Sequence, residues 1–281
     1  MQSDRIYLGL IGGLGDIIYG YIHNDEWKCL ADYKRLNPET KVKAIIVSYN
    51  PEAYKIVELN PYIDEVVQHP PKREMRDKGW HQDRVIGQYA NGYSSFKAMD
   101  RIHLIREATR LHLAPEEKPL IKQFSLGRTA IVHPFAIDTA RIPFPAYEYR
   151  RVIDKLCERN FNKIICLGGT HTKSFGSDEE YKRIEEFNYH KEGQLLNLVN
   201  NTNVRVSAAL VSFSDLFVGT WSCYGVTAWM CGIKSIVAVP QSMLAGCSKI
   251  HKGKYKDHHP QDMIFGIDGN RTTIKTIVRA I

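Results

Sequence analysis

The 281-residue chain lacks the features of membrane-spanning and of secreted, disulfide-linked proteins. No apolar run approaches the roughly 18 residues that a membrane-spanning helix needs, and the N-terminus has no signal-peptide core. The six cysteines form no C-x-x-C pair and no zinc-like spacing, so free and mostly buried thiols are expected. These absences predict a cytoplasmic location and no metal site.

Several nucleotide-binding and catalytic motifs are also missing. The chain has no G-K-[ST] of a P-loop, no G-x-S-x-G elbow of a hydrolase and no H-E-x-x-H metal site. A dinucleotide-binding loop is excluded too, because Ile18 stands where the third small residue would be. The second strand ends V-S-Y-N (47–50), without the acid that such a loop needs.

The formal charge of +7 is concentrated in the second half of the chain. Residues 1–122 carry 18 basic and 17 acidic side chains, whereas residues 123–281 carry 20 and 14. A basic half indicates an anionic partner. Nucleotides, nucleic acids and phosphorylated glycans all meet that description, so charge alone does not choose among them.

Strand and helix patterns alternate along the chain. Apolar runs predict strands at residues 6–8, 42–48, 64–67, 129–133, 163–167, 216–219 and 235–239. Helical patterns are found at residues 17–22, 51–59, 95–113, 147–159, 206–213, 226–231 and 271–281. Because A-P-E-E-K-P (114–119) reads as a linker, we expect an α/β protein with two Rossmann-like domains, 1–120 and 121–281. The last helix is expected to pack back on the first domain, and ligands to bind in a cleft at the carboxyl ends of the strands.

The stretch from Gly9 to Tyr21 reads G-L-I-G-G-L-G-D-I-I-Y-G-Y and follows the first predicted strand. A strand, a glycine-rich turn with Gly13 and Gly15, and a helix start together present backbone N–H groups to a ligand. Asp16 has two interpretations. It is either an acid favoured in the first helical turn by the helix dipole, or a general base at the rim of a cleft.

Several segments together resemble the heptosyltransferase-like glycosyltransferases, which have the two-domain GT-B fold. G-G-L-G-D (12–16) is similar to their N-terminal signature, and I-V-H-P-F, R-I-P-F-P and C-L-G-G (within 131–169) to the opening of their second domain. Residues 208–240 are similar to the donor-binding strand, turn and helix. The resemblance implies a metal-independent, inverting sugar transfer from a nucleotide-sugar, without a cofactor and with Asp16 as general base.

The resemblance also implies donor-binding residues in the second half. In the family, a basic residue before a W-P-like step contacts the donor diphosphate. Arg141 is the best match, and the alternative is a surface arginine in a proline-rich loop. The other candidates are Gly168, Gly169, Thr170, Ser222, Cys223, Tyr224 and Gly225. Residues 168–170 equally fit an ordinary turn, and Ser222 equally fits a helix N-cap.

Two departures from the family pattern concern the donor. Trp221-Ser222-Cys223 replaces an acidic residue followed by Ser-Gly, and Val226 replaces a histidine. The family positions help to hold the sugar nucleotide, so the resemblance does not assign ADP-heptose as the donor.

Two basic segments, around residues 72–80 and 249–259, are candidates for acceptor binding, and their alternative is a solvated surface loop. The candidate residues are Lys72, Arg73, Arg76, Trp80, Lys252 and Lys254. The leading hypothesis is an enzyme that extends a surface glycan on a saccharide or lipid-linked acceptor. A second is a phage-type DNA glycosyltransferase, which flips a hydroxymethylated base toward Asp16. A third is a non-catalytic nucleotide-sugar sensor.

Overall fold

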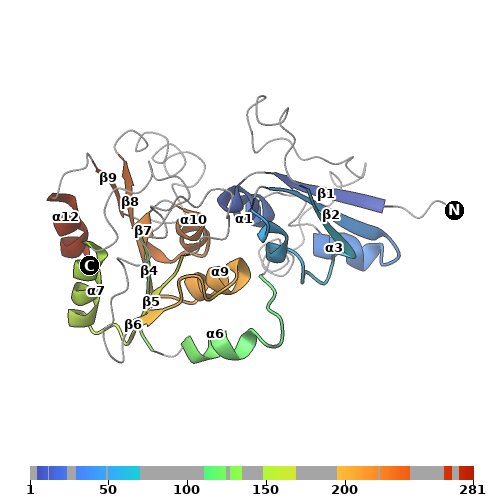
Figure 1. Cartoon of the computed structure of the whole chain (residues 1–281). Helices are drawn as coiled ribbons and strands as arrows, with labels where there is room; N and C mark the ends of the chain where they lie inside the picture. The colour runs from blue at the N-terminus through green and yellow to red at the C-terminus, as the bar shows by residue number, and fades with distance from the viewer. Residues whose placement is uncertain are drawn as a thin grey trace. The chain divides into compact units, whose positions relative to one another are not determined.

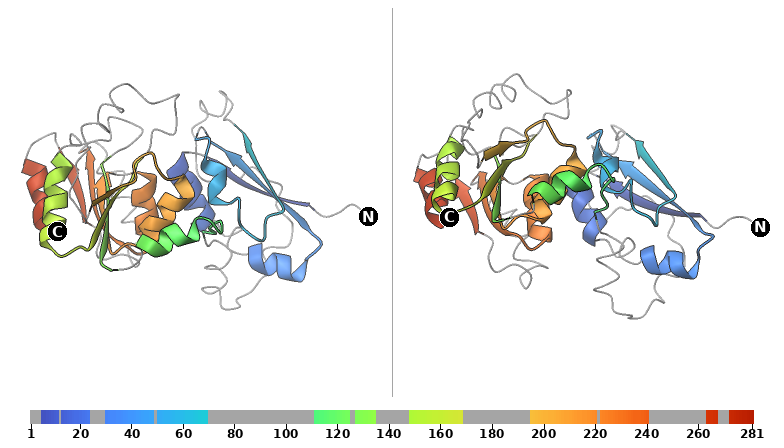
Figure 2. Two further views of the ribbon diagram at one scale, coloured as in Figure 1. Left: turned by 60° about the horizontal axis from the view of Figure 1, so that its bottom comes forward. Right: turned by 90° about the horizontal axis from the view of Figure 1, so that it is seen from below.

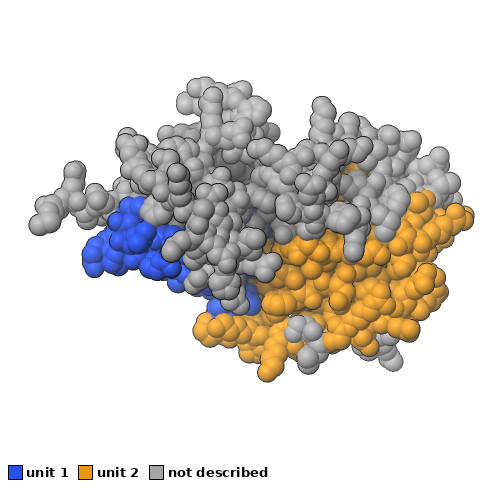
Figure 3. Space-filling model, turned by 180° about the vertical axis from the view of Figure 1, so that it is seen from behind, with its two compact units in different colours: residues 1–114 blue, residues 115–281 orange. Residues whose placement is uncertain are grey.

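The computed structural model describes residues 5–11, 13–23, 30–48, 50–69, 111–124, 127–134, 148–168, 195–220, 222–240, 263–267 and 272–281. The chain divides into two compact units, Met1–Ala114 and Pro115–Ile281, which Figure 3 shows in different colours. The division follows residue 114, whereas the predicted domains meet at residue 120. Each unit contains a parallel β-sheet with helices, so the predicted α/β fold class is confirmed.

In the part of the first unit that the structure describes, three parallel strands form a sheet in the order β1-β2-β3 (Figure 1). They are β1 (Arg5–Ile11), β2 (Lys41–Val47) and β3 (Glu65–His69), and each overlaps a predicted strand. The chain passes from β1 to β2 through α1 (Leu14–His23) and α3 (Leu30–Leu36), and from β2 to β3 through the short 3₁₀ helix η1 (Ala53–Ile56). Of the predicted helix over 95–113, residues 95–110 lie outside the described part of the chain, and residues 111–113 have no regular structure.

Helix α1 is held by its apolar face. Ile17, Ile18 and Tyr21 are buried at the spacing predicted for one side of a helix. The Tyr21 hydroxyl accepts a hydrogen bond of 2.9 Å from the side-chain amide of Asn60, which is itself buried. Burying each large apolar side chain stabilises the fold by about 2 kcal/mol. The position of α1 in the first unit is therefore fixed by packing together with a buried hydrogen bond.

The described residues of the second unit form six parallel strands in the order β6-β5-β4-β7-β8-β9. The strands are β4 (Thr129–His133), β5 (Lys163–Cys166), β6 (Leu195–Asn197), β7 (Leu216–Thr220), β8 (Lys234–Pro240) and β9 (Met263–Ile267). The chain moves outward from β4 to β6, returns to place β7 on the other side of β4, and then moves outward again. This is the doubly wound order, with its switch point between β4 and β7.

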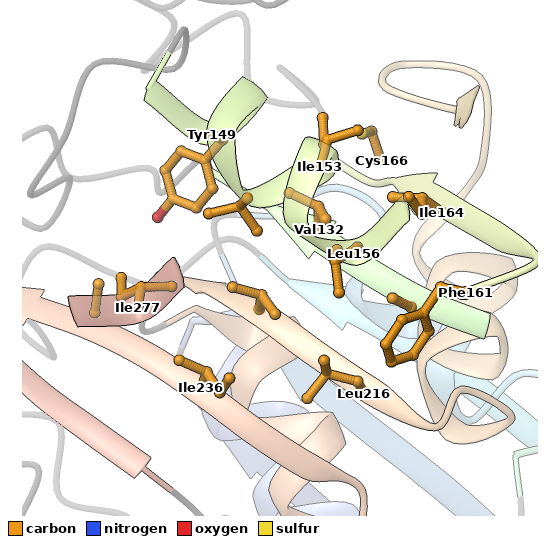
Figure 4. Close-up of a cluster of buried hydrophobic side chains, with 14 of the residues drawn as sticks. Val132, Tyr149, Ile153, Leu156, Phe161, Ile164, Cys166, Leu216, Ile236 and Ile277 are labelled. Atoms are coloured by element: carbon orange, nitrogen blue, oxygen red, sulfur yellow. The ribbon is translucent and has the colours of Figure 1, made fainter. Parts of the chain in front are cut away.

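Helices cover both faces of this sheet. Figures 1 and 2 show α7 (Tyr149–Glu158) and α12 (Thr272–Ala280) on one face, and α9 (Val204–Ser212) and α10 (Cys223–Met230) on the other. Alternate residues of each strand point to opposite faces. Ala130 and Val132 of β4 accordingly pack in the core beneath α7, which Figure 4 shows in close-up.

Helix α12 packs in the core of the second unit. Ile274 and Ile277 are buried in the same cluster as the side chains of α7, and the two helices contact each other. The apolar face of the last helix is therefore used within its own unit. The expected packing of this helix on the first domain stays a prediction.

The segment predicted as a linker is partly helical and belongs to the second unit. Helix α6 (Lys118–Phe124) starts inside it and contacts α9. Pro119 lies in the first turn, where a backbone N–H has no partner within the helix and proline is tolerated. Directly before α6, Glu117 accepts two hydrogen bonds of 2.8 Å from Arg205 of α9. This buried ion pair joins the residue directly before α6 to α9 of the second unit.

Helix α10 ends in a left-handed residue. Gly232 has a φ of 72°, and the next residue, Ile233, donates its N–H to the carbonyl of Ala228 at 2.9 Å. A glycine tolerates this conformation without a steric penalty and so ends the helix just before β8. Among the residues that the structure describes, no helix combines the length and the apolar character needed to cross a membrane.

Four cysteines fall within the described residues, and all four are free. Cys166 is buried, Cys157 and Cys223 are half-buried, and Cys231 is exposed. The prediction of free thiols is confirmed for these four, whereas full burial holds for Cys166 alone among them.

Candidate functional site

The carboxyl edge of the second sheet brings together the ends of β5, β4 and β7, which are neighbours in that order. β4 ends at His133, β5 continues into Leu167 and Gly168, and β7 ends at Thr220, just before Ser222. Doubly wound sheets bind ligands at this kind of switch point. The topology thus places Gly168 and the residues that follow β7 at one edge of the sheet, although they are far apart in the sequence.

His133 contacts both neighbouring segments. Its Nδ1 lies 2.7 Å from the carbonyl oxygen of Leu167, and its ring meets the ring of Tyr224 edge-on, with centroids 4.8 Å apart. His133 is only 4% exposed. Burial lowers its pKa from 6.5 to about 4, and the hydrogen bond to Leu167 opposes this shift only in part. The imidazole is therefore neutral at pH 7, and because a carbonyl only accepts, Nδ1 carries the proton.

The sequence reasoning did not select His133 as a site residue. It ends the apolar run T-A-I-V-H, and a single histidine at the end of a buried strand is a weak signal. The informative feature was its place in the run, because a polar side chain at the carboxyl end of a parallel strand lies at the edge where ligands bind.

Two glycines permit close backbone approach at this edge. Gly219 of β7 is paired with His133 of β4, and a Cβ on Gly219 would clash with the His133 carbonyl. A Cβ on Gly225 would lie 3.2 Å from the carbonyl oxygen of Thr220, at the end of β7. The first turn of α10 is therefore packed tightly against the strand that precedes it.

Ser222 is the N-cap of α10. Its backbone is extended, its hydroxyl accepts a hydrogen bond of 3.4 Å from the N–H of Gly225, and its carbonyl accepts the helical N–H of Val226 at 3.0 Å. The N-cap interpretation of Ser222 is confirmed by these bonds, while its role in donor binding stays a prediction. The N–H groups of Cys223 and Tyr224 belong to the first turn of the helix, and both contact the Cys223 thiol.

Cys223 adds no negative charge at this helix start. Burial raises the pKa of its thiol to about 12, so the side chain is neutral at pH 7. A thiolate here would compete with an anionic ligand for the positive end of the helix dipole. The neutral thiol leaves the helix start favourable to an anion.

In the first unit, Asp16 is the third residue of α1, which begins at Leu14. The N–H of Ile17 donates to the carbonyl of Gly13 at 3.0 Å, so Gly13 directly precedes the helix and Gly15 lies in its first turn. The backbone of Asp16 is thus where the sequence predicted it, at the carboxyl end of β1. Its side chain lies outside the described residues, and its function as a base stays a prediction.

The remaining predicted site residues lie outside the described part of the chain. They are Arg141, Gly169 and Thr170 on the donor side, and Lys72, Arg73, Arg76, Trp80, Lys252 and Lys254 on the acceptor side. Within the residues that the structure does describe, no group of three or more His, Cys, Asp or Glu side chains is placed to hold a metal ion.

No protein-family model and no curated protein sequence matches this chain. Solved structures do match it. A glycosyl transferase of family 9 from Veillonella parvula DSM 2008 gives a TM-score of 0.56 at 13% identity, covering 100% of this chain and 94% of that one. The ADP-heptose lipopolysaccharide heptosyltransferase II of E. coli also gives 0.56 at 13% identity, with coverages of 99% and 97%.

A third match is the E. coli heptosyltransferase WaaC with ADP-2-deoxy-2-fluoro heptose, with a TM-score of 0.52 at 9% identity, covering 98% of this chain and 99% of that one. Identities this low establish the fold rather than the substrate. At the level of fold they confirm the resemblance to the heptosyltransferase-like glycosyltransferases. This chain has the two-domain GT-B fold of these enzymes.

Proposed function

We propose that this protein is a glycosyltransferase that uses a nucleotide-sugar as donor. The observation that carries the proposal is that nearly the whole chain matches nearly whole glycosyltransferases. The three matches cover at least 98% of this chain and at least 94% of the relative. Two separate α/β units are thus matched in the same order. One of these relatives was solved with an ADP-sugar analogue, which supports a donor of the nucleotide-sugar class.

The donor binds to the second unit in this proposal. The switch point between β4 and β7 supports this placement, as does the capped start of α10 beside it. A nucleoside diphosphate carries negative charge that the positive end of the α10 helix dipole, together with Arg141, would stabilise. Gly168, Gly169 and Thr170 would allow the backbone to approach the nucleotide. Trp221 and Val226 stand where the family has residues that help to hold the sugar nucleotide. We therefore assign neither the sugar nor the nucleotide of the donor.

The reaction is an inverting displacement. Asp16 takes the proton from an acceptor hydroxyl while that oxygen attacks the anomeric carbon. The bond from the anomeric carbon to the donor diphosphate breaks, and its electron pair leaves with the nucleoside diphosphate. A positioned general base contributes roughly 10²- to 10⁴-fold to such a step. Following the family resemblance, we propose that no metal takes part.

The acceptor that we propose is a saccharide of a surface glycan, as the resemblance implies, and the reaction takes place in the cytoplasm. The DNA alternative depends on the basic segments around residues 72–80 and 249–259, which lie outside the described residues. No observation on the described residues favours DNA over a glycan, so that alternative remains a hypothesis for the test below.

A thermal-shift panel tests the proposal with the full chain. ADP-, UDP-, GDP-, CMP- and dTDP-sugars are added singly in the presence of EDTA, and at least one is expected to raise the melting temperature. The stabilising donor is then offered oligosaccharide and hydroxymethylated-DNA acceptors, and release of the nucleoside diphosphate is measured. A panel in which no nucleotide-sugar stabilises the fold would overturn the proposal.

A further inference from the structure

One side chain joins the two segments that we propose for the donor. β4 lies between β5 and β7, and His133 stands at its carboxyl end. On one side its Nδ1–H reaches the Leu167 carbonyl at 2.7 Å, directly before Gly168. On the other side its ring contacts the ring of Tyr224 in the first turn of α10, at 4.8 Å between centroids and an interplanar angle of 85°. An edge-to-face contact of this kind is attractive for aromatic rings.

The surroundings leave the imidazole little room to move. Leu167 is fully buried, and His133 and Tyr224 are each 4% exposed. The backbone of His133 is fixed as well, because its carbonyl lies against Gly219, where no side chain fits. A ring packed between two buried neighbours cannot turn to solvent without breaking both contacts. His133 therefore links the end of β5 to the start of α10 through side-chain contacts.

We infer that His133 is a positioning residue of the donor site, which holds the end of β5 and the first turn of α10 where both contact one nucleoside diphosphate. This inference rests on the proposed function. His133 acts through its two neighbours and touches no reacting atom. Its loss should weaken donor binding, because the two segments would have to be ordered when the ligand binds.

Two substitutions separate the two contacts of His133. His133→Asn keeps an N–H donor near the place of Nδ1 and removes the ring. His133→Phe keeps a ring against Tyr224 and removes the donor, which leaves the buried Leu167 carbonyl without this hydrogen bond. Ile277→Val is the matched control, because Ile277 is a fully buried core residue of α12 and lies in neither of the two segments that His133 contacts.

Affinity is measured by titration calorimetry with ADP, UDP, GDP, dTDP and CMP. We expect His133→Phe to raise the Kd of the nucleotide that binds by about tenfold, the effect of losing roughly 1.4 kcal/mol. His133→Asn should raise it by about threefold, and Ile277→Val by less than twofold. In turnover, KM for the donor should rise in the same order while kcat stays within about twofold.

The outcomes distinguish this inference from the proposed function. Wild-type protein that binds none of the five nucleotides contradicts both. Wild-type protein that binds one of them, with both His133 variants binding equally well, overturns the inference and leaves the proposed function standing. If a variant does not fold, hydrogen exchange of the wild-type protein decides. Nucleotide is expected to protect residues 163–168 and 222–227 together, and protection of one segment without the other would overturn the inference.

Discussion

Gly219 and His133 face each other across β7 and β4 so closely that a Cβ on Gly219 would lie less than 3.0 Å from the His133 carbonyl oxygen. The clash would be with backbone, which cannot rotate away as a side chain can. Gly219→Ala must therefore push the two central strands apart. We expect it to lower the free energy of unfolding by about 2–3 kcal/mol in urea denaturation.

Gly225→Ala is the control for this prediction. Its Cβ would lie 3.2 Å from the Thr220 carbonyl, a smaller conflict, and alanine is favoured over glycine within a helix by about 1 kcal/mol. The two effects offset each other, so its stability should lie within about 1 kcal/mol of wild type. If both variants lost the same free energy of unfolding, the close contact between Gly219 and the His133 carbonyl would not be the reason for a glycine at position 219.

The buried imidazole of His133 predicts that acid destabilises the protein. Its pKa is 6.5 when exposed and about 4 in the folded state, so between these values the unfolded chain binds more protons. Stability from this group is then fully present above pH 6.5 and is lost as the pH falls toward 4. The loss over this window amounts to about 3 kcal/mol. Urea denaturation at several pH values measures it.

His133→Phe serves as the reference for this pH series, because it removes the titrating group at the same position. The difference between wild type and variant should shrink as the pH falls from 6.5 to 4. A constant difference across the window would mean that His133 is not held neutral in the folded protein.

The ion pair between Glu117 and Arg205 predicts a strong effect of removing one charge. Both side chains are less than a tenth exposed, and two hydrogen bonds of 2.8 Å join them. Glu117→Gln would leave the Arg205 guanidinium buried without its counter-charge, at an expected loss of about 3–5 kcal/mol. Urea denaturation of the single variant gives this value.

The double variant Glu117→Gln/Arg205→Met separates charge from packing. It removes both charges, so we expect it to be less destabilised than Glu117→Gln alone. If the double variant were less stable than Glu117→Gln alone, the unbalanced charge of Arg205 would not be the main cause of the stability loss.

The parts of the fold that the sequence predicted well are those with long apolar runs. Strand β4 was predicted at its observed bounds, 129–133, because all five of its residues are buried and the run is bordered by Arg128 and Pro134. The elements that were missed are short or polar. Helix α3 has seven residues with a polar outer face, and β6 has three half-buried residues, so neither produces a recognisable period.

Helix α6 was missed for a different reason. Two prolines border residues 115–119, and proline usually marks a loop, but Pro119 lies in the first turn of the helix, where it is allowed. The start of α10 was placed at residue 226, whereas the helix begins at Cys223, because small polar residues such as Ser222 favour both turns and N-caps. The site residue His133 was missed because strand order, which places it at a switch point, is not visible in local patterns.

The central claim is that a nucleotide-sugar reacts at a site in which Asp16 is the base. The direct measurement compares wild type with Asp16→Asn, using the nucleotide-sugar that stabilises the protein and an acceptor that is turned over. We expect kcat to fall by roughly 10²- to 10⁴-fold in the variant. The Kd for the nucleoside diphosphate should stay within about twofold, because we assign that ligand to the second unit. An Asp16→Asn enzyme that turns over at the wild-type rate would contradict the account.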